Sequence, residues 1–232
     1  MSETVLTIVN DNEPGQGLAN DWGLSIHVSL PDGRRLLFDF DTKPEVLEYN
    51  MPRLGLDPAK VELGVLSHRH MDHAGGLSYI AKANPGITVY TTPDAAEVAR
   101  EQGVSRVKVN DTGGVIGEGL ALTRPLPAIG LLEHGLVINT DRGKPILLVG
   151  CSHPGVDRIA SLASEIVGGR LHLVIGGFHK PSRSELDRLA GLAEYISPIH
   201  CSGEQAKDYV KRVFPGKYVG ARTGSVLEVP LD

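Results

Sequence analysis

The chain has 232 residues, 41% of them hydrophobic and 22% charged, with a formal net charge of -5 and two cysteines. This length fits a single domain over residues 1–232, and a chain without a basic excess is not expected to bind nucleic acid or anionic lipid. Because no segment has the pattern of a leader or a membrane span, and two cysteines are too few for a disulfide scaffold, the sequence predicts a cytoplasmic protein with no membrane partner.

The first half of the chain alternates strands and helices. Strands are predicted over residues 5–9, 24–30 and 35–40, and the turn Pro31-Asp32-Gly33 joins the last two into a hairpin. A helix over 43–54, a strand over 61–67, a helix over 77–83, a strand over 88–91 and a helix over 93–102 follow, the last closed by Gly103. This alternation is typical of a layered α/β domain.

The second half repeats this organisation after a stretch of short strands. Gly-rich turns from Val104 to Thr123 indicate that a second sheet begins here, and residues 136–140 are expected to pair with 146–149 across the turn Asp141–Lys144. The remaining predictions are a helix over 155–167, a strand over 171–175, a helix over 184–195, a strand over 197–200 and a helix over 204–213. No linker separates the halves, which favours one sandwich of two mixed sheets with helices outside.

The densest group of potential metal ligands follows the strand predicted over 61–67. His68, His70, Asp72 and His73 stand within six residues, and Gly75-Gly76 comes directly after them. A tight loop with this many side-chain nitrogen and oxygen atoms can direct several ligands at one or two divalent metals. A loop that is rich in histidine by chance is disfavoured, because such groups are costly to leave unpaired and half buried.

Several motifs together resemble the metallo-β-lactamase superfamily, and within it the branch of dihydropteroate-synthase-like metallohydrolases. They are Val5–Asn12, Trp22–Ser25, Leu36–Asp39, Asn50 with Leu54-Gly55, Val65–Leu77, Gly150–Gly155, Ile175–His179 and Pro198–Gly203. They come in the same order as in the family and span nearly the whole chain. The resemblance implies a four-layer αββα sandwich with a metal site along one edge, where strand ends of both halves meet.

The resemblance also assigns roles in the first half of the chain. It implies that His68 and His70 bind one metal while Asp72 and His73 bind the other. The alternative for Asp72 and His73 is that they do not bind the metal but hold a residue that does. Asp39, at the end of a predicted strand, is our candidate for holding the far ring nitrogen of a ligand histidine, and a plain strand-end cap is its alternative.

The second half departs from the family pattern at one ligand. Many members carry Gly-Asp where this chain has Gly150-Cys151, and the carboxylate of that Asp bridges two metals. His153 is the expected replacement ligand and His200 the last histidine ligand, while Cys151 is either a further thiolate ligand or a small buried side chain. Without the bridging carboxylate, one metal and two asymmetric sites both remain open.

Four other histidines carry weaker expectations. His179 follows a predicted strand and is a ligand, a substrate-facing acid or a structural residue. His134 lies where some members have their middle histidine, but no matching motif surrounds it. His27 and His172 stand within predicted strands and are expected to be packed or surface side chains. Cys151 and Cys201 each adjoin a predicted ligand, so we expect them near each other, with ligation, unbridged thiols and a disulfide all open.

The expected activity is hydrolysis by a metal-activated water, with Asp72 and His179 as catalytic side chains. Zinc suits the imidazole-rich ligands, and iron and manganese accept similar ones. Lys180 and Arg183 are predicted to select a small anionic substrate, such as a phosphate ester, cyclic phosphate, lactone or pterin-related compound, although most surface charges contribute little energy.

Two other classes of protein remain as alternatives. Di-iron redox members carry an acidic metal loop and usually a flavin domain, and this chain has neither. A metal-binding regulatory protein stays open because the bridging Asp is missing. The sequence does not indicate an oligomeric state.

Overall fold

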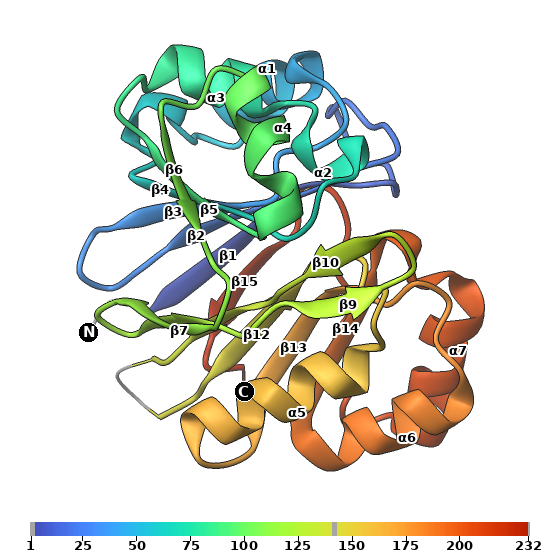
Figure 1. Cartoon of the computed structure of the whole chain (residues 1–232). Helices are drawn as coiled ribbons and strands as arrows, with labels where there is room; N and C mark the ends of the chain where they lie inside the picture. The colour runs from blue at the N-terminus through green and yellow to red at the C-terminus, as the bar shows by residue number, and fades with distance from the viewer. Residues whose placement is uncertain (1–2, 141–142, 232) are drawn as a thin grey trace. The chain divides into compact units, whose positions relative to one another are not determined.

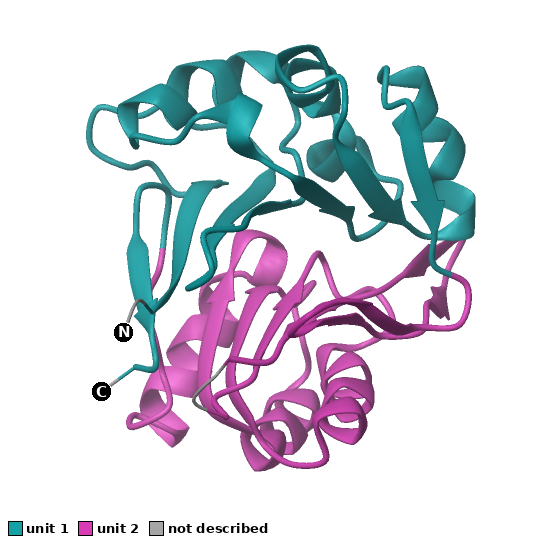
Figure 2. Cartoon of the chain, turned by 90° about the vertical axis from the view of Figure 1, so that its left-hand side faces the viewer, with its two compact units in different colours: residues 1–110, 222–232 teal, residues 111–221 magenta. Residues whose placement is uncertain are grey.

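The computed structural model describes residues 3–140 and 143–231. The chain divides into two compact units, residues 1–110 with 222–232 and residues 111–221 (Figure 2). The prediction of one domain over residues 1–232 stays a prediction. Within the described ranges, no helix is both long and apolar enough to cross a membrane.

The first unit is built on a seven-stranded sheet with the order β15-β1-β2-β3-β4-β5-β6 (Figure 1). Its strands are β1 Thr4–Asp11, β2 Leu24–Ser29, β3 Arg35–Phe38, β4 Leu63–Leu66, β5 Thr88–Thr91, β6 Arg106–Val109 and β15 Val226–Val229. Strands β3 to β6 are parallel and the others antiparallel. Strands β2 and β3 form the predicted hairpin.

Helices of the first unit bury their apolar side chains against this sheet. They are α1 Pro44–Arg53, α2 Met71–Ala74, α3 Leu77–Ala83 and α4 Ala96–Glu101, with single turns η1 Pro58–Lys60 and η2 Pro93–Ala95. Leu47 of α1 and Ile80 of α3 are fully buried in one cluster with Leu37 and Val89 of the strands. Burial of a leucine or isoleucine side chain contributes about 1.5–3 kcal/mol, so this cluster holds the helices in place.

The second unit carries a six-stranded sheet, ordered β14-β13-β12-β11-β8-β7, and a separate β9–β10 hairpin. Its strands are β7 Gly114–Gly117, β8 Leu120–Leu122, β9 Leu126–Ala128, β10 Leu131–Glu133, β11 Leu136–Ile138, β12 Ile146–Val149, β13 Leu171–Gly177 and β14 Ala193–Ile199. Helices α5 Val156–Val167, α6 Arg183–Leu192 and α7 Glu204–Val213 pack on it, and η3 His200–Ser202 follows β14 (Figure 1).

The predicted α/β class with two mixed sheets is confirmed, and a predicted helix boundary is wrong. β6 pairs with β5 in the first sheet, and the second sheet begins at β7, inside the predicted stretch from Val104 to Thr123. The helix predicted over 184–195 ends at Leu192, because Ala193 is fully buried in a parallel pairing with Leu171. The metal-ligand loop contains one helical turn, α2. The predicted turn residues 141 and 142 lie outside the described residues.

Candidate metal centre

The ligand loop of the first unit leaves the C-terminal end of β4 and turns at once into α2. His68 and His70 precede this helix, while Asp72 and His73 are part of it. Two glycines allow α2 to pack closely on the chain after β3. A Cβ on Gly75 would collide with the carbonyl oxygen of Thr42, and one on Gly76 with that of Phe40. The Gly-Gly pair is therefore a steric requirement of the loop.

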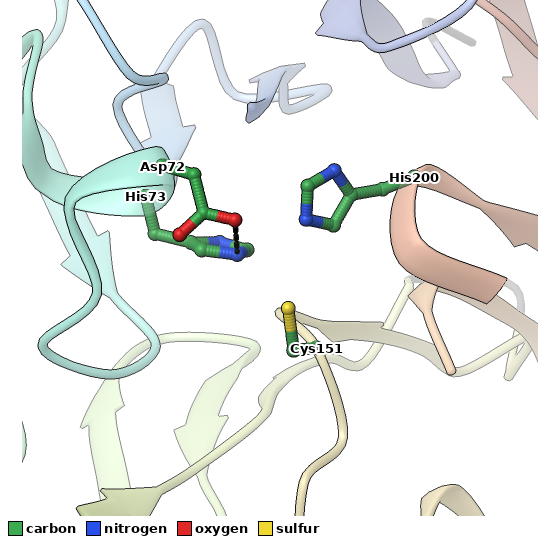
Figure 3. A group of neighbouring side chains, drawn as sticks. All are labelled: Asp72, His73, Cys151 and His200. Carbon is green, nitrogen blue, oxygen red and sulfur yellow. Dashed lines mark ion pairs between the residues drawn. The ribbon is translucent and has the colours of Figure 1, made fainter. Parts of the chain in front are cut away.

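The four side chains form two pairs with the spacing of metal ligands. The Nε2 atom of His68 is 3.1 Å from Nδ1 of His70. The Nε2 atom of His73 is 3.6 Å from Oδ2 of Asp72 (Figure 3). Two nitrogen ligands of one tetrahedral zinc lie roughly 3.3 Å apart, given bonds of about 2.0–2.1 Å. The donor atoms and their distances in each pair therefore fit a divalent metal.

Asp39 is fully buried beneath this loop and holds both pairs. Its carboxylate accepts hydrogen bonds from the Ser67 backbone N–H at 2.8 Å, from Ser67 Oγ at 2.8 Å and from Nδ1 of His73 at 2.6 Å. Ser67 Oγ also lies 2.9 Å from Nδ1 of His68. A hydrogen bond at Nδ1 fixes the ring and leaves Nε2 as the metal-binding nitrogen. Asp39 thus touches His73 directly and reaches His68 through Ser67, as a supporting residue would.

Trp22 is a neighbour of the loop to which the sequence assigned no role. Its indole Nε1 donates a hydrogen bond of 3.1 Å to Oδ2 of Asp72, while 56% of the residue is exposed. The bond restricts one carboxylate oxygen of a predicted ligand. In the sequence, Trp22 stands out only as the single tryptophan of the chain and as part of the motif Trp22–Ser25 that resembles the superfamily.

In the second unit, a buried carboxylate organises the loop after β12 that carries Cys151 and His153. Glu133 is fully buried and accepts hydrogen bonds from the backbone N–H groups of Cys151, Ser152 and His153 at 2.8, 2.6 and 2.7 Å. Three donors on one carboxylate set the direction in which this loop presents its side chains. Sequence reasoning missed this role, because no motif surrounds Glu133 or its buried neighbour His134.

The other predicted groups of the second unit follow the two neighbouring strands. His179 comes after β13, and His200 and Cys201 lie in η3 after β14. The ring of His153 has its centroid 4.3 Å from that of His179. The Cys151 and Cys201 sulfurs and a ring nitrogen of His179 lie within 4.8 Å of one another, and neither cysteine is in a disulfide. Figure 3 draws Cys151 and His200.

Backbone strain gathers at these residues. Asp39, Ser152, His179 and His200 all have positive φ values, between 44° and 61°. Residues other than glycine adopt this left-handed region at a cost of about 1–3 kcal/mol, and such strain tends to occur at functional sites. His179 and His200 are predicted site residues, Asp39 supports His73, and Ser152 lies between Cys151 and His153.

Cys201 and His179 shift each other's titration. A hydrogen bond with the Cys151 side chain, and a smaller one with His179, lower the pKa of the buried Cys201 thiol below its ordinary value. The hydrogen bond to Cys201 in turn raises the pKa of His179, against the opposing effect of burial. The pair is therefore biased towards a thiolate beside an imidazolium.

Lys180 and Arg183, which were predicted to select the substrate, have different surroundings, and they can be compared with Arg69 and Arg222 of the first unit. Lys180 is exposed next to His179, and its backbone N–H donates to the Cys201 carbonyl at 3.2 Å. The Arg183 guanidinium lies over the Tyr209 ring, 5.7 Å from its centroid. Arg69 lies 3.8 Å from Asp94, and Arg222 lines a cavity of about 470 Å³ in the first unit. Lys180 is the one of these four that directly adjoins a predicted site residue of the second unit.

The two histidines predicted to lie outside the site are both buried. His27 in β2 has no hydrogen-bond partner at either ring nitrogen among the described residues, and burial lowers its pKa to about 4. His172 in β13 places Nδ1 2.5 Å from Glu194. Both are packed side chains, as expected for histidines within strands.

Comparison with known proteins identifies the family. The family model of the metallo-beta-lactamase superfamily matches residues 28–198. The chain belongs to this superfamily. It is 26% identical to the 7,8-dihydropterin-6-methyl-4-(beta-D-ribofuranosyl)-aminobenzene-5'-phosphate synthase of Methanocaldococcus jannaschii, over 89% of this chain and 89% of that protein. The resemblance to this branch seen in the sequence motifs is confirmed.

Solved structures agree on the fold. A crystal structure of a metal-dependent hydrolase of the beta-lactamase superfamily matches with a TM-score of 0.80 and 27% identity, covering 97% of this chain and 99% of that chain. The short form of human tRNase Z matches with a TM-score of 0.66 and 14% identity over 98% of this chain and 100% of its own, and shares the fold alone. This protein therefore has the metallo-β-lactamase fold.

Proposed function

We propose that this protein is a metal-dependent hydrolase acting on a small anionic molecule. In this proposal His68, His70, Asp72 and His73 of the first unit, with His153 and His200 of the second, hold one or two divalent ions. The observation that carries it is the Asp39–Ser67 network, which orients His68 and His73 through their Nδ1 atoms. Imidazole and carboxylate donors suit zinc, and they accept iron or manganese.

The side chains of this chain divide the chemical work as follows. A divalent metal held by these residues would supply Lewis-acid chemistry and an acidified water molecule. Asp72, whose carboxylate is restrained by the Trp22 indole, would serve as the side chain that orients the water and accepts a proton. His179 is exposed and has a raised pKa, which suits the donation of a proton to a leaving group. Asp72 lies in α2, shortly after the end of β4, and His179 lies on the loop after β13.

The proposed substrate is a phosphate ester, cyclic phosphate, lactone or pterin-related compound. The archaeal relative is named for a product that contains both a pterin and a phosphate. Lys180 supplies an exposed ammonium group beside His179, and a positive charge next to the reacting group favours a phosphate or carboxylate over a neutral ligand.

The test combines metal analysis with a substrate panel. Protein purified without chelator is expected to contain zinc, iron or manganese, and to hydrolyse at least one phosphodiester, phosphomonoester or lactone. Lys180→Ala should lower kcat/KM for an anionic ester more than for its neutral analogue, and Lys82→Ala, on α3 of the first unit, is the matched control. Tight metal binding without turnover of any panel member would favour the regulatory alternative, and a reducible iron pair would favour the redox one.

A further inference from the structure

Cys151, His179 and Cys201 are brought to one edge of the second sheet by three adjacent parallel strands. Val149 of β12 pairs with Gly176 of β13, and Gly177 pairs with Ile199 of β14. The chain reaches Cys151, His179 and Cys201 two residues beyond Val149, Gly177 and Ile199, respectively. Because the C-terminal ends of parallel strands meet at one edge, the pairing of the sheet itself places these side chains together.

The packing around the two sulfurs depends on glycine. A Cβ on Gly177 would lie 2.7 Å from the Cys201 sulfur, and a Cβ on Gly176 would collide with the Val149 carbonyl oxygen. Both cysteines are more than nine-tenths buried, whereas His179 is exposed. The backbone thus brings two sheltered sulfur atoms beside one accessible imidazole.

We propose that Cys151, Cys201 and His179 form a site for a thiophilic metal ion, such as zinc. Two sulfurs and one nitrogen around a tetrahedral zinc lie roughly 3.5–3.8 Å apart, given bonds of about 2.3 Å to sulfur and 2.0–2.1 Å to nitrogen. The three donor atoms already lie within 4.8 Å of one another. Side-chain rotations that move the donor atoms by about 1 Å close the site. Metal binding releases to water the protons that the two cysteines and His179 share.

The ligand set defines what such a site accepts. Thiolates favour zinc and copper(I) over magnesium, calcium or manganese. With three protein donors, a tetrahedral ion keeps one position for water or a ligand, and the exposed side of His179 gives access to it. Every residue in the proposed site belongs to the second unit. While the ion is bound, His179 is its ligand and does not serve as the proton donor of the proposed hydrolase.

Cobalt(II) provides a direct test, because sulfur ligation gives an intense near-ultraviolet charge-transfer band. The full chain, kept reduced with a phosphine and cleared of metal by chelator, is titrated with cobalt(II) alone. The parent is expected to show the band, and Cys151→Ser and Cys201→Ser are each expected to weaken it. His179→Ala should shift the titration to higher cobalt concentration. The matched control is His70→Ala, another exposed histidine, which should leave the band unchanged.

The same titration separates this site from the proposed hydrolase centre. A His68→Ala, His70→Ala double variant should lose hydrolysis and keep the sulfur band. Absence of the band in folded parent protein at saturating cobalt overturns the proposal. It is also overturned if Cys151→Ser abolishes the band while Cys201→Ser leaves it intact, because the sulfur would then belong to a site without Cys201. Circular dichroism of each variant checks that a lost band does not reflect unfolding.

Discussion

Replacing Asp39 by asparagine should impair metal binding by changing the tautomer of His73. The Ser67 backbone N–H donates to Oδ1 of Asp39, so an asparagine would keep its oxygen there and place its amide nitrogen at the Oδ2 position. That position faces Ser67 Oγ and Nδ1 of His73, at 2.8 and 2.6 Å. An amide donor would force Nδ1 to accept and Nε2 to carry the proton, which removes the lone pair that binds a metal.

Asp39→Asn should lower both the metal affinity and the stability of the metal-free protein. Loss of a partner that orients a ligand typically costs 10–100-fold in metal affinity, or about 1.4–2.7 kcal/mol. Nδ1 of His73 would keep a partner after this change of tautomer, whereas the buried Ser67 hydroxyl would lose its acceptor at roughly 1–3 kcal/mol, so Asp39→Asn should destabilise the metal-free protein by about that amount. The loss of metal affinity should appear even under conditions where the variant is fully folded.

Competition with a chromophoric chelator measures the zinc affinity, and urea unfolding of the chelated protein measures stability. Asp32→Asn is the matched control, because Asp32 lies in the exposed turn before β3 and pairs only with Arg34 among the contacts seen. That change should cost less than about 1 kcal/mol and leave zinc affinity unchanged. A folded Asp39→Asn variant that binds zinc as tightly as the parent would refute the tautomer argument.

Three further changes test other parts of the structure. Glu133→Gln should destabilise the protein by about 1–3 kcal/mol in urea unfolding, because an amide N–H group would replace an oxygen that accepts from the backbone. The control Glu62→Gln, at an exposed position, should have little effect. His27 stays neutral in the folded protein down to its pKa of about 4, so the folded state loses stability on the order of 3 kcal/mol as the pH falls from 6.5 to 4. His27→Leu should reduce this pH-dependent loss of stability, measured by unfolding at pH 7 and pH 4.5. An unchanged pH dependence in the variant would contradict the assignment to His27. Gly177→Ala should cost about 1–3 kcal/mol, because its Cβ would lie 2.4 Å from the Gly150 carbonyl oxygen and 2.7 Å from the Cys201 sulfur. Gly191→Ala, in α6 with open space around it, should be neutral or stabilising, and equal effects of the two changes would argue against the close packing.

The sequence indicates that the predicted ligands stand at strand ends, because strand ends depend on local pattern. Each predicted ligand follows an apolar strand, and strand ends can be recognised from runs such as Ile146–Val149 and the glycines after them. The ends of parallel strands then lie at one edge of a sheet, so β12, β13 and β14 bring Cys151, His179 and Cys201 together without further information.

The residues that hold the ligands were harder to predict, because their contacts are distant in sequence. Asp39 reaches His73 across 34 residues, and Glu133 reaches Cys151 across 18. A buried acidic side chain leaves no periodic signal, and Asp39 was proposed only from its place at a strand end. The end of α6 was misjudged for a related reason. The pairing of Ala193 with Leu171 is a tertiary contact, and it overrides the helical pattern that precedes it.

The two units use the same physical device to orient their ligand loops. In the first unit Asp39 accepts from a backbone N–H, a hydroxyl and an imidazole, and in the second Glu133 accepts from three backbone N–H groups. A buried carboxylate is costly to desolvate, and several charge-assisted hydrogen bonds offset that cost only when the donors are already in place. Each carboxylate therefore couples the conformation of its loop to the folding of its own unit. Because the loops are ordered by protein contacts, a metal would bind to positioned side chains, and less of its binding energy would be spent on ordering them.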